Sequence, residues 1–335
     1  MSEYESRCGY VIVTDTVSAD GQTDVSDALQ RLIDENPNRT LFFPDGVYKL
    51  SKPILTPAHP KKSVALRLSN YAVIKASEDW SSDEAMIRLG ASHPANDIYT
   101  IGSNYSLVGG IIDGSGIAGG VSIDGGRETM IRDVSMKHVK IGLHIKYGAN
   151  SGSSDCDILG VNITGNGAHD SIGVLLEGYD NTLTNMRIAR VQTGVLLKSA
   201  GNSLRNIHPL YTCGYEDYQN SCGFWDMAGN NWYNFCYSDH FGVGFRTAPN
   251  VRGIYDSCFT MWYCGRGEVH TAFKADGQFN SVMTNFNIGF RDNETENIVL
   301  RAAEKGGHGV IDRLSVNQSL TTDDEYKAYM TGIYF

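Results

Sequence analysis

Two short residue patterns recur along most of this chain, and they constrain its fold more than any other feature. In the first, a polar residue precedes an apolar segment, and successive members lie 21 to 29 residues apart. Its members are Asp133-Val134, Asp157-Ile158, Asn185-Met186, Asn206-Ile207, Asn234-Phe235, Asp256-Ser257 and Asn285-Phe286. In the second, a small residue precedes an alternating segment: Gly142-Leu143, Gly173-Val174, Gly194-Val195, Gly223-Phe224, Gly244-Phe245 and Ala272-Phe273. Self-similarity with this period is typical of a solenoid, in which each repeat is one coil.

The separation between the two patterns indicates where the coils carry loops. It alternates between 9 or 10 and 16 or 17 residues, so every second coil has extra residues at one corner. These loops are 158–172, 207–222 and 257–271. Insertions at one corner of a solenoid lie on one face, which is often the binding face. We therefore expect a groove at the short coil 234–244, between the last two loops.

The composition and charge agree with one solenoid domain that does not bind nucleic acid. The chain has 335 residues with 37 Gly, 18 Tyr and only 8 Pro, which suits many short strands joined by tight turns. A net charge of −10 argues against a nucleic-acid partner and against a general attraction to anionic membranes. We predict one domain over 1–335, with an N-terminal segment at 1–60 and helical turns at 61–335.

The N-terminal segment is expected to contain a short capping helix. Residues 24–27 offer side-chain oxygens that can satisfy the first amides of a helix running to about Glu35. Leu29, Leu32 and Ile33 would give this helix one apolar face. An open solenoid end exposes unpaired strands, and a helix placed over it prevents end-to-end pairing.

The same segment resembles a known group of proteins. The residues that carry the resemblance are Asp20-Gly21, Ala28-Leu29-Gln30 and Phe43-Pro44-Asp45-Gly46-Val47-Tyr48. They look like the N-terminal segment of pectate-lyase-like proteins, a superfamily that includes pectate lyases, polygalacturonases, inulin fructotransferases and phage tailspike depolymerases. The resemblance implies an all-β fold, a right-handed single-stranded parallel β-helix, and a carbohydrate-active function. It also implies possible association as a homotrimer.

The resemblance does not extend to a catalytic signature. Gly307-His308-Gly309 matches one element of the polygalacturonases, but the other elements are missing from the sequence. A fold by itself does not establish a function. The candidate chemistry must therefore be sought in the expected groove.

The expected groove carries acids beside aromatic residues, a combination that suits carbohydrate. Glycosidic cleavage needs one carboxyl group to protonate the leaving oxygen and a second to act as base or nucleophile. Asp239 and Glu216 are the best-placed pair, with Asp226 in reserve, while Trp262 and Tyr263 could contact sugar rings. The alternative for each acid is a solvated loop residue.

A second feature points to a different chemistry. Strand alternation places Trp225, Arg246 and Lys274 at the same outward position of three successive coils, and Arg266 could join them. Such cations could hold a uronate carboxylate and assist an elimination. The alternative is that they pair with nearby acids such as Asp276.

Two histidines in this region are further candidates. His270 could act as a catalytic acid or base, and His240 could contact substrate. The alternative for each is a hydrogen-bonded structural histidine. Cys236 and Cys258 occupy matching positions of adjacent coils, where free buried thiols filling space are expected.

Three functions follow as hypotheses. The first is a glycoside hydrolase or transglycosylase with two carboxylates. The second is a polysaccharide lyase, and the third is a non-catalytic glycan-binding or phage tail solenoid. No CxxC pair and no clustered acidic loop occurs in the sequence, so neither a metal nor a cofactor is expected.

The cellular location stays open at this level. The N-terminus has no apolar run, so no secretion signal is visible, and no segment is long enough to span a membrane. A cytoplasmic protein or a part of a phage particle is expected, unless the natural sequence begins earlier.

Overall fold

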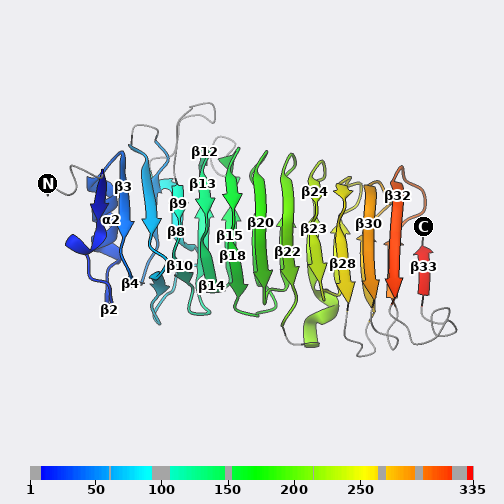
Figure 1. Cartoon of the computed structure of the whole chain (residues 1–335), viewed down its shortest axis with the longest axis horizontal. Helices are drawn as coiled ribbons and strands as arrows, with labels where there is room; N and C mark the ends of the chain where they lie inside the picture. Colours follow the sequence, from blue (N-terminus) through cyan, green and yellow to red (C-terminus); the bar gives the residue numbers. More distant parts are fainter. Residues whose placement is uncertain are drawn as a thin grey trace. The chain divides into compact units, whose positions relative to one another are not determined.

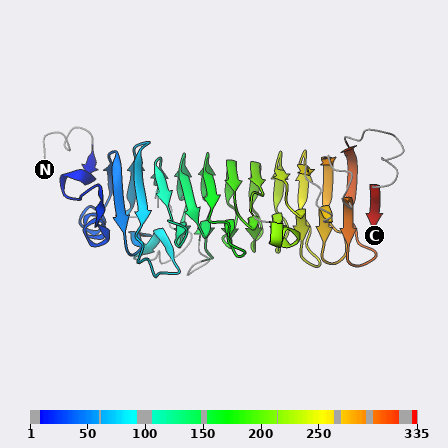
Figure 2. The ribbon, with the colours of Figure 1, turned by 90° about the horizontal axis from the view of Figure 1, so that it is seen from below.

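The computed structural model describes residues 9–59, 62–92, 106–147, 153–213, 215–262, 269–290, 297–318 and 330–334. Two compact units form, one from Met1–Asn166 with Glu177–Asn181 and the other from Gly167–Leu176 with Thr182–Phe335. Each unit is a run of right-handed parallel β-helix, as predicted. Within each unit, strands of successive coils lie side by side (Figure 1; Figure 2). The prediction of a single domain stays a prediction.

The first unit contains one α-helix, one short 3-10 helix and eighteen strands among its described residues. The elements are β1 (Tyr10–Ile12), η1 (Val13–Asp15), β2 (Asp20–Asp24), α2 (Ser26–Glu35), β3 (Arg39–Phe43), β4 (Gly46–Leu50), β5 (Ile54–Pro57), β6 (Val64–Leu68), β7 (Ala72–Ala76), β8 (Ala85–Ser92), β9 (Ser106–Val108), β10 (Ile111–Asp113), β11 (Gly119–Ile123), β12 (Gly126–Arg127), β13 (Met130–Arg132), β14 (Ser135–Val139), β15 (Ile141–Ile145), β16 (Ser153–Ser154), β17 (Asp157–Leu159) and β18 (Asn162–Gly165).

The second unit contains fifteen strands and one 3-10 helix in its described part. The elements are β19 (Ile172–Leu176), β20 (Thr182–Ala189), β21 (Thr193–Leu197), β22 (Ser203–Leu210), η4 (Tyr215–Asn220), β23 (Cys222–Asp226), β24 (Trp232–Asn234), β25 (Tyr237–Asp239), β26 (Val243–Thr247), β27 (Ile254–Asp256), β28 (Phe259–Trp262), β29 (His270–Ala275), β30 (Val282–Phe290), β31 (Asn297–Ala302), β32 (Val310–Gln318) and β33 (Met330–Tyr334).

Helix α2 lies at the N-terminal end of the first unit, as expected for a cap (Figure 1). Its buried residues include Leu29, Leu32 and Ile33, which form the apolar face predicted for it. The Gln30 side chain accepts a hydrogen bond from the Leu55 amide at 2.8 Å and donates one to the Leu55 carbonyl at 3.1 Å. The helix therefore satisfies backbone groups of β5 in the way that a neighbouring strand would.

Each coil of the second unit passes through two sheets. Strands β20, β22, β24, β25, β27, β28, β30 and β32 form the first, the bent sheet. Strands β19, β21, β23, β26, β29, β31 and β33 form the second, the short-strand sheet. A single residue with positive φ bends each coil of the first sheet, which therefore presents two outer faces joined at a corner.

The bend explains the first sequence pattern. The residues at this corner are Asn185, Asn206, Phe235, Ser257, Asn285 and Arg313, with φ between 51° and 56°. Asparagine tolerates this left-handed conformation, whereas it costs a typical residue roughly 1–2 kcal/mol. Two members of the pattern, Asn234 and Asp256, lie one residue before the corner. In the first unit, Asp133 lies beside Gly160 of the next coil and not beside Asp157. The pattern member in that coil is therefore displaced by three residues from the corner.

The second sequence pattern is explained by close packing at the start of the short strands. A Cβ atom on Gly194 would lie 2.4 Å from the carbonyl oxygen of Gly223, and one on Gly223 would lie 2.7 Å from that of Gly244. Real Cβ atoms do not approach a neighbour this closely. The small-residue ladder is therefore required wherever successive coils meet here.

The core of the second unit is a set of stacked aromatic ladders. The rings of Phe224 and Phe245 lie 4.8 Å apart at 7°, and those of Tyr233 and Tyr255 lie 4.5 Å apart at 15°. These four side chains are almost fully buried. Parallel strands in register place equivalent residues of adjacent coils directly beside one another, so the stacking follows from the repeat.

A buried polar ladder closes the turn after β23. Asn231 accepts hydrogen bonds from the Asn202 amide at 2.9 Å and from its side chain at 3.2 Å. The Asn231 side chain donates to the Ser199 carbonyl at 3.0 Å and to Asp226 at 3.1 Å. Asn202, Asn231 and Asp226 have no solvent exposure. One amide group therefore connects three chain segments inside the unit.

The cysteines agree with the predicted space-filling role. Cys236 and Cys258 are fully buried, and the Phe259 amide donates to the Cys236 carbonyl, which places the two residues on adjacent coils. Cys156, Cys222, Cys236 and Cys258 are buried free thiols.

Candidate functional site

Asp239 ends strand β25 on the outer face of the bent sheet, in the short coil predicted to form the site. Its carboxylate contacts two imidazoles: His208 Nε2 lies 3.4 Å from Oδ2, and His240 Nδ1 lies 2.5 Å from Oδ1. His208 comes from β22 on the preceding coil, whereas His240 follows Asp239 in the chain. The Asp239 side chain remains 12% exposed, so it can be reached from solvent.

A row of three half-buried rings lies beside this carboxylate, and we call it the aromatic row. His208 stacks on Tyr237 with ring centres 4.2 Å apart at 15°, and Tyr237 stacks on Phe259 at 4.7 Å and 29°. The three residues belong to β22, β25 and β28 and occupy the same outward position of successive coils. The sequence analysis gave no role in the site to His208, which lies in the predicted loop 207–222, or to Phe259. Tyr237 lies 29 residues after His208 and 22 residues before Phe259. These spacings match the repeat, and they are the signal that could have identified both residues.

The environment of Asp239 keeps its carboxyl group ionised. Burial raises its pKa, but hydrogen bonds from His208 and His240 outweigh burial, and the pKa falls to about 2. A carboxylate with such a pKa accepts a proton or attacks a carbon at neutral pH, and it does not serve as an acid. Asp239 is therefore suited to the base or nucleophile role.

A buried aromatic cluster supports the site from inside. The Trp262 ring is 2% exposed and lies 4.5 Å from Tyr218, 5.1 Å from His270 and 5.5 Å from His240. The structure therefore brings Asp239, His240, Trp262 and His270 together, as the sequence analysis expected. Trp262 lies beneath the surface, where it packs against His240.

His270 is enclosed completely within this cluster. Its Nδ1 atom donates to the Phe241 carbonyl at 2.8 Å, and its ring is parallel to that of Trp262 within 5°. The Nε2 atom is buried and has no hydrogen-bond partner within the described part of the chain. Burial lowers the pKa of His270 to about 3, because a second proton would find no acceptor.

This burial predicts a pH dependence of stability. The folded-state pKa of about 3 lies below the unfolded value of 6.5, so only the unfolded chain gains a proton as the pH falls between them. Between pH 7 and pH 5, His270 should lower the free energy of unfolding by about 2 kcal/mol. Denaturant unfolding at both pH values measures this loss, which His270→Gln should remove and exposed His308→Gln should preserve. Equal pH dependence in His270→Gln and the wild type would contradict the assignment.

Three predicted residues lie where their side chains are not described. Tyr263 and Arg266 fall outside the described residues, and only the backbone of Glu216 is described, within η4. This 3-10 helix is anchored beside the site, because the Tyr218 hydroxyl donates to the Phe241 carbonyl at 3.2 Å. Glu216 precedes Tyr218 by two residues, and the Tyr218 ring packs against Trp262.

Trp225, Arg246 and Lys274 belong to the other sheet of the coil. They occupy adjacent positions of β23, β26 and β29, as predicted, and Arg301 of β31 continues the row. Arg246 lies 4.0 Å above the Trp225 ring and pairs with Asp276 at 2.8 Å. These cations therefore face away from the bent sheet that carries Asp239.

Asp226 is placed inside the turn after β23. Its oxygens accept hydrogen bonds from the Gly229 amide at 2.8 Å, the Tyr233 hydroxyl at 3.0 Å and the Asn231 side chain at 3.1 Å. Burial raises its pKa, against the effect of these bonds. With no exposure to solvent, this carboxylate organises the turn.

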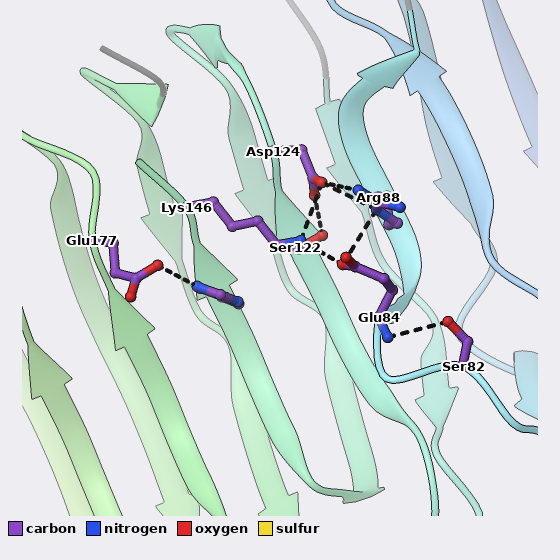
Figure 3. Close-up of polar contacts among 8 residues, drawn as sticks. Ser82, Glu84, Arg88, Ser122, Asp124, Lys146 and Glu177 are labelled. Carbon is purple, nitrogen blue, oxygen red and sulfur yellow. Dashed lines mark hydrogen bonds and ion pairs between the residues drawn. The ribbon is translucent and has the colours of Figure 1, made fainter. Parts of the chain in front are cut away.

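The first unit carries a separate charged network on its short strands (Figure 3). Asp124 pairs with Arg88 and also accepts from Lys146 at 3.2 Å, and Lys146 pairs with Glu84. Beside them, His144 Nε2 lies 2.9 Å from Glu177. Burial raises the pKa of Asp124, but its hydrogen bonds and cations lower it overall. Burial lowers the pKa of Arg88, but its hydrogen bond and charge pairing with Asp124 outweigh burial and raise it overall, so this network is better suited to joining strands than to proton transfer.

A surface hollow lies in the first unit. Its volume is about 670 Å³, and its lining includes Lys49, Lys75 and Asp79. None of the described residues that line it is a histidine. The described residues contain no group of three or more His, Cys, Asp or Glu able to hold a metal ion. They also contain no helix with the length and apolarity needed to cross a membrane.

Comparison with known proteins relates the chain to carbohydrate-active families and phage tailspikes. A family model described as rhamnogalacturonase A/epimerase, pectate lyase-like, matches residues 12–216. No curated protein matches significantly. A mutant tailspike of Escherichia coli bacteriophage HK620, solved with a pentasaccharide, has 12% identity and a TM-score of 0.71 over 99% of this chain and 66% of its own.

Two further structures share the fold. ORF18 of Geobacillus virus E2 has 14% identity and a TM-score of 0.62, covering 94% of this chain and 62% of its own. PfbA, a surface adhesin of Streptococcus pneumoniae, has 13% identity and a TM-score of 0.53, covering 92% and 90%. At such identities the likeness shows the fold alone. This chain spans about two thirds of each phage protein.

Proposed function

The chain belongs to the rhamnogalacturonase A/epimerase, pectate lyase-like family, and from this membership we propose that it binds a saccharide chain at the aromatic row and hydrolyses a glycosidic bond beside Asp239. The family match confirms the resemblance seen in the N-terminal motif and the repeats. The observation that carries the proposal is an ionised carboxylate placed at the edge of three stacked, half-exposed rings.

The aromatic row supplies the binding surface in this proposal. Sugar rings carry apolar C–H faces that pack on aromatic rings, while their hydroxyl groups need fixed donors and acceptors. Tyr237 and Phe259 offer such ring surfaces, and His208 and His240 offer polar atoms next to Asp239. Because the row follows successive coils, it suits an extended saccharide better than a single sugar.

Hydrolysis requires two groups with different proton affinities. We assign the base or nucleophile role to Asp239, since hydrogen bonds from His208 and His240 lower its pKa to about 2 against the effect of burial. We assign proton donation to Glu216, because η4 is anchored beside the site through Tyr218. The two imidazoles hold the Asp239 carboxylate in one orientation.

A lyase is the second candidate, and one observation favours it. Arg246, Lys274 and Arg301 lie on three adjacent strands of the short-strand sheet, with Asp276 pairing with the first two. Such a cationic row can neutralise a uronate and assist a β-elimination. It faces away from Asp239, so hydrolysis and elimination would occur at different surfaces. Association into homotrimers also stays a prediction.

Product analysis separates the two candidates. The full chain is incubated with rhamnogalacturonan, polygalacturonate and a panel of bacterial surface polysaccharides, while reducing ends and near-ultraviolet absorbance are recorded. Hydrolysis releases reducing ends without absorbance, whereas elimination creates a C=C bond that absorbs. We expect reducing ends alone. Absorbing products would favour the lyase, and polysaccharide binding without any product would leave a glycan-binding solenoid.

A further inference from the structure

One corner of the bent sheet carries an aromatic residue. In the second unit, the other left-handed corner positions are the polar residues Asn185, Asn206, Ser257, Asn285 and Arg313. Phe235 occupies the same position with φ of 54°. A bulky residue at positive φ is an outlier, whereas asparagine is enriched there. Compared with the equivalent corners of the other coils, Phe235 differs in placing an apolar aromatic ring there.

Burial does not compensate for this strain. Phe235 is 55% exposed, so its ring gains little from packing inside the unit. Strained residues persist where the surroundings or a function maintain them, and they are concentrated at ligand sites. A residue that does not suit its local backbone conformation, and that gains no packing there, points to a function.

Phe235 lies in the coil that holds Asp239, between two further outward aromatic residues. Trp232 on β24 is 46% exposed, and Tyr237 on β25 is part of the aromatic row. The equivalent residues of the preceding coil are Ser203, Asn206 and His208, and those of the following coil are Ile254, Ser257 and Phe259. Among these three coils, only the one with Asp239 is aromatic at all three outer positions.

We propose that Trp232, Phe235 and Tyr237 form an aromatic corner that binds a sugar unit next to the one beside Asp239. The proposal rests on the proposed function. Phe235 presents its ring to the C–H face of a pyranose, and the saccharide turns from the row on β25 across the corner toward Trp232. The strained backbone at Phe235 is maintained because asparagine, which suits the corner better, would remove the ring.

The test compares Phe235→Asn with the wild type in stability and in saccharide binding. Asparagine relieves the strain, so the Tm should rise by about 2 °C. Loss of an exposed aromatic anchor should weaken binding of the longest panel polysaccharide about tenfold. Phe235→Tyr keeps both ring and strain, and should match the wild type in both measurements. Tyr71→Asn removes a 74% exposed aromatic in the first unit and should leave binding unchanged.

The outcomes distinguish this inference from the proposed function. Unchanged binding by Phe235→Asn, with the wild type cleaving its polysaccharide, would reject the aromatic corner and leave hydrolysis intact. A lower Tm in this variant would show that Phe235 stabilises the fold, which also overturns the inference. If the wild type neither binds nor cleaves rhamnogalacturonan, polygalacturonate or the bacterial polysaccharides, the proposed function fails first.

Discussion

Replacing Asp239 with asparagine is expected to slow glycan cleavage by roughly 10³-fold, within the range for loss of a positioned acid–base group. The amide preserves the size of the side chain and can still accept a hydrogen bond from His208 or His240. It cannot accept a proton from water or form a glycosyl ester, so the chemical step loses its carboxylate. Binding should change only a few-fold, because the aromatic row is untouched.

The measurement is the release of reducing ends under single-turnover conditions, with saccharide affinity determined in parallel. Asp276→Asn is the matched control, because its carboxylate pairs with Arg246 on the other sheet. It should leave hydrolysis within a few-fold of the wild type. Full cleavage by Asp239→Asn would remove Asp239 from the mechanism. Loss of cleavage only in Asp276→Asn would instead favour catalysis at the cationic row of Arg246, Lys274 and Arg301.

Asn231→Ala is expected to lower the free energy of unfolding by about 4 kcal/mol, the largest stability effect that we predict. The side chain makes four hydrogen bonds and has no solvent exposure. Its removal leaves the Asn202 amide, the Ser199 carbonyl and Asp226 without one partner each, and a buried unsatisfied group costs roughly 1–3 kcal/mol. Asp226 would suffer most, because its charge is also buried.

Denaturant unfolding of the full chain at pH 7 measures this effect. Asn287→Ala is the control, since this exposed residue makes a single side-chain bond of 2.9 Å to the Asn285 carbonyl. It should change the free energy of unfolding by no more than about 0.5 kcal/mol. A loss below about 1 kcal/mol for Asn231→Ala would mean that water or a shifted turn replaces the ladder.

Much of the fold could be predicted because each coil repeats the same local requirements. Close contact with the next coil requires a small residue at Gly194 and Gly223, and the left-handed corner favours asparagine at Asn185 and Asn206. These requirements depend on a residue and its immediate neighbours, so they leave marks at fixed intervals. The helix cap was predictable for the same reason, since its apolar face recurs with the helical period.

The candidate site was predictable only in part. Asp239, His240, Trp262 and His270 were expected together and lie together, because the short coil and its flanking loops share one corner. The depth of each group was not predictable, since burial of His270 and Trp262 depends on Tyr218 and Phe290 from other coils. Asp226 likewise reads as an ordinary acid in the sequence, although three turn residues and Tyr233 enclose it.

The sequence by itself determined the coil and the two residue patterns that mark it, because strand alternation and left-handed turns are local properties. Only the tertiary structure decided that Arg246 and Asp239 face opposite ways and that Phe235 rather than Asn234 forms the corner. The physical reason is that rung register is set by hydrogen bonds between residues more than twenty positions apart. A shift of one residue there turns every following side chain to another face.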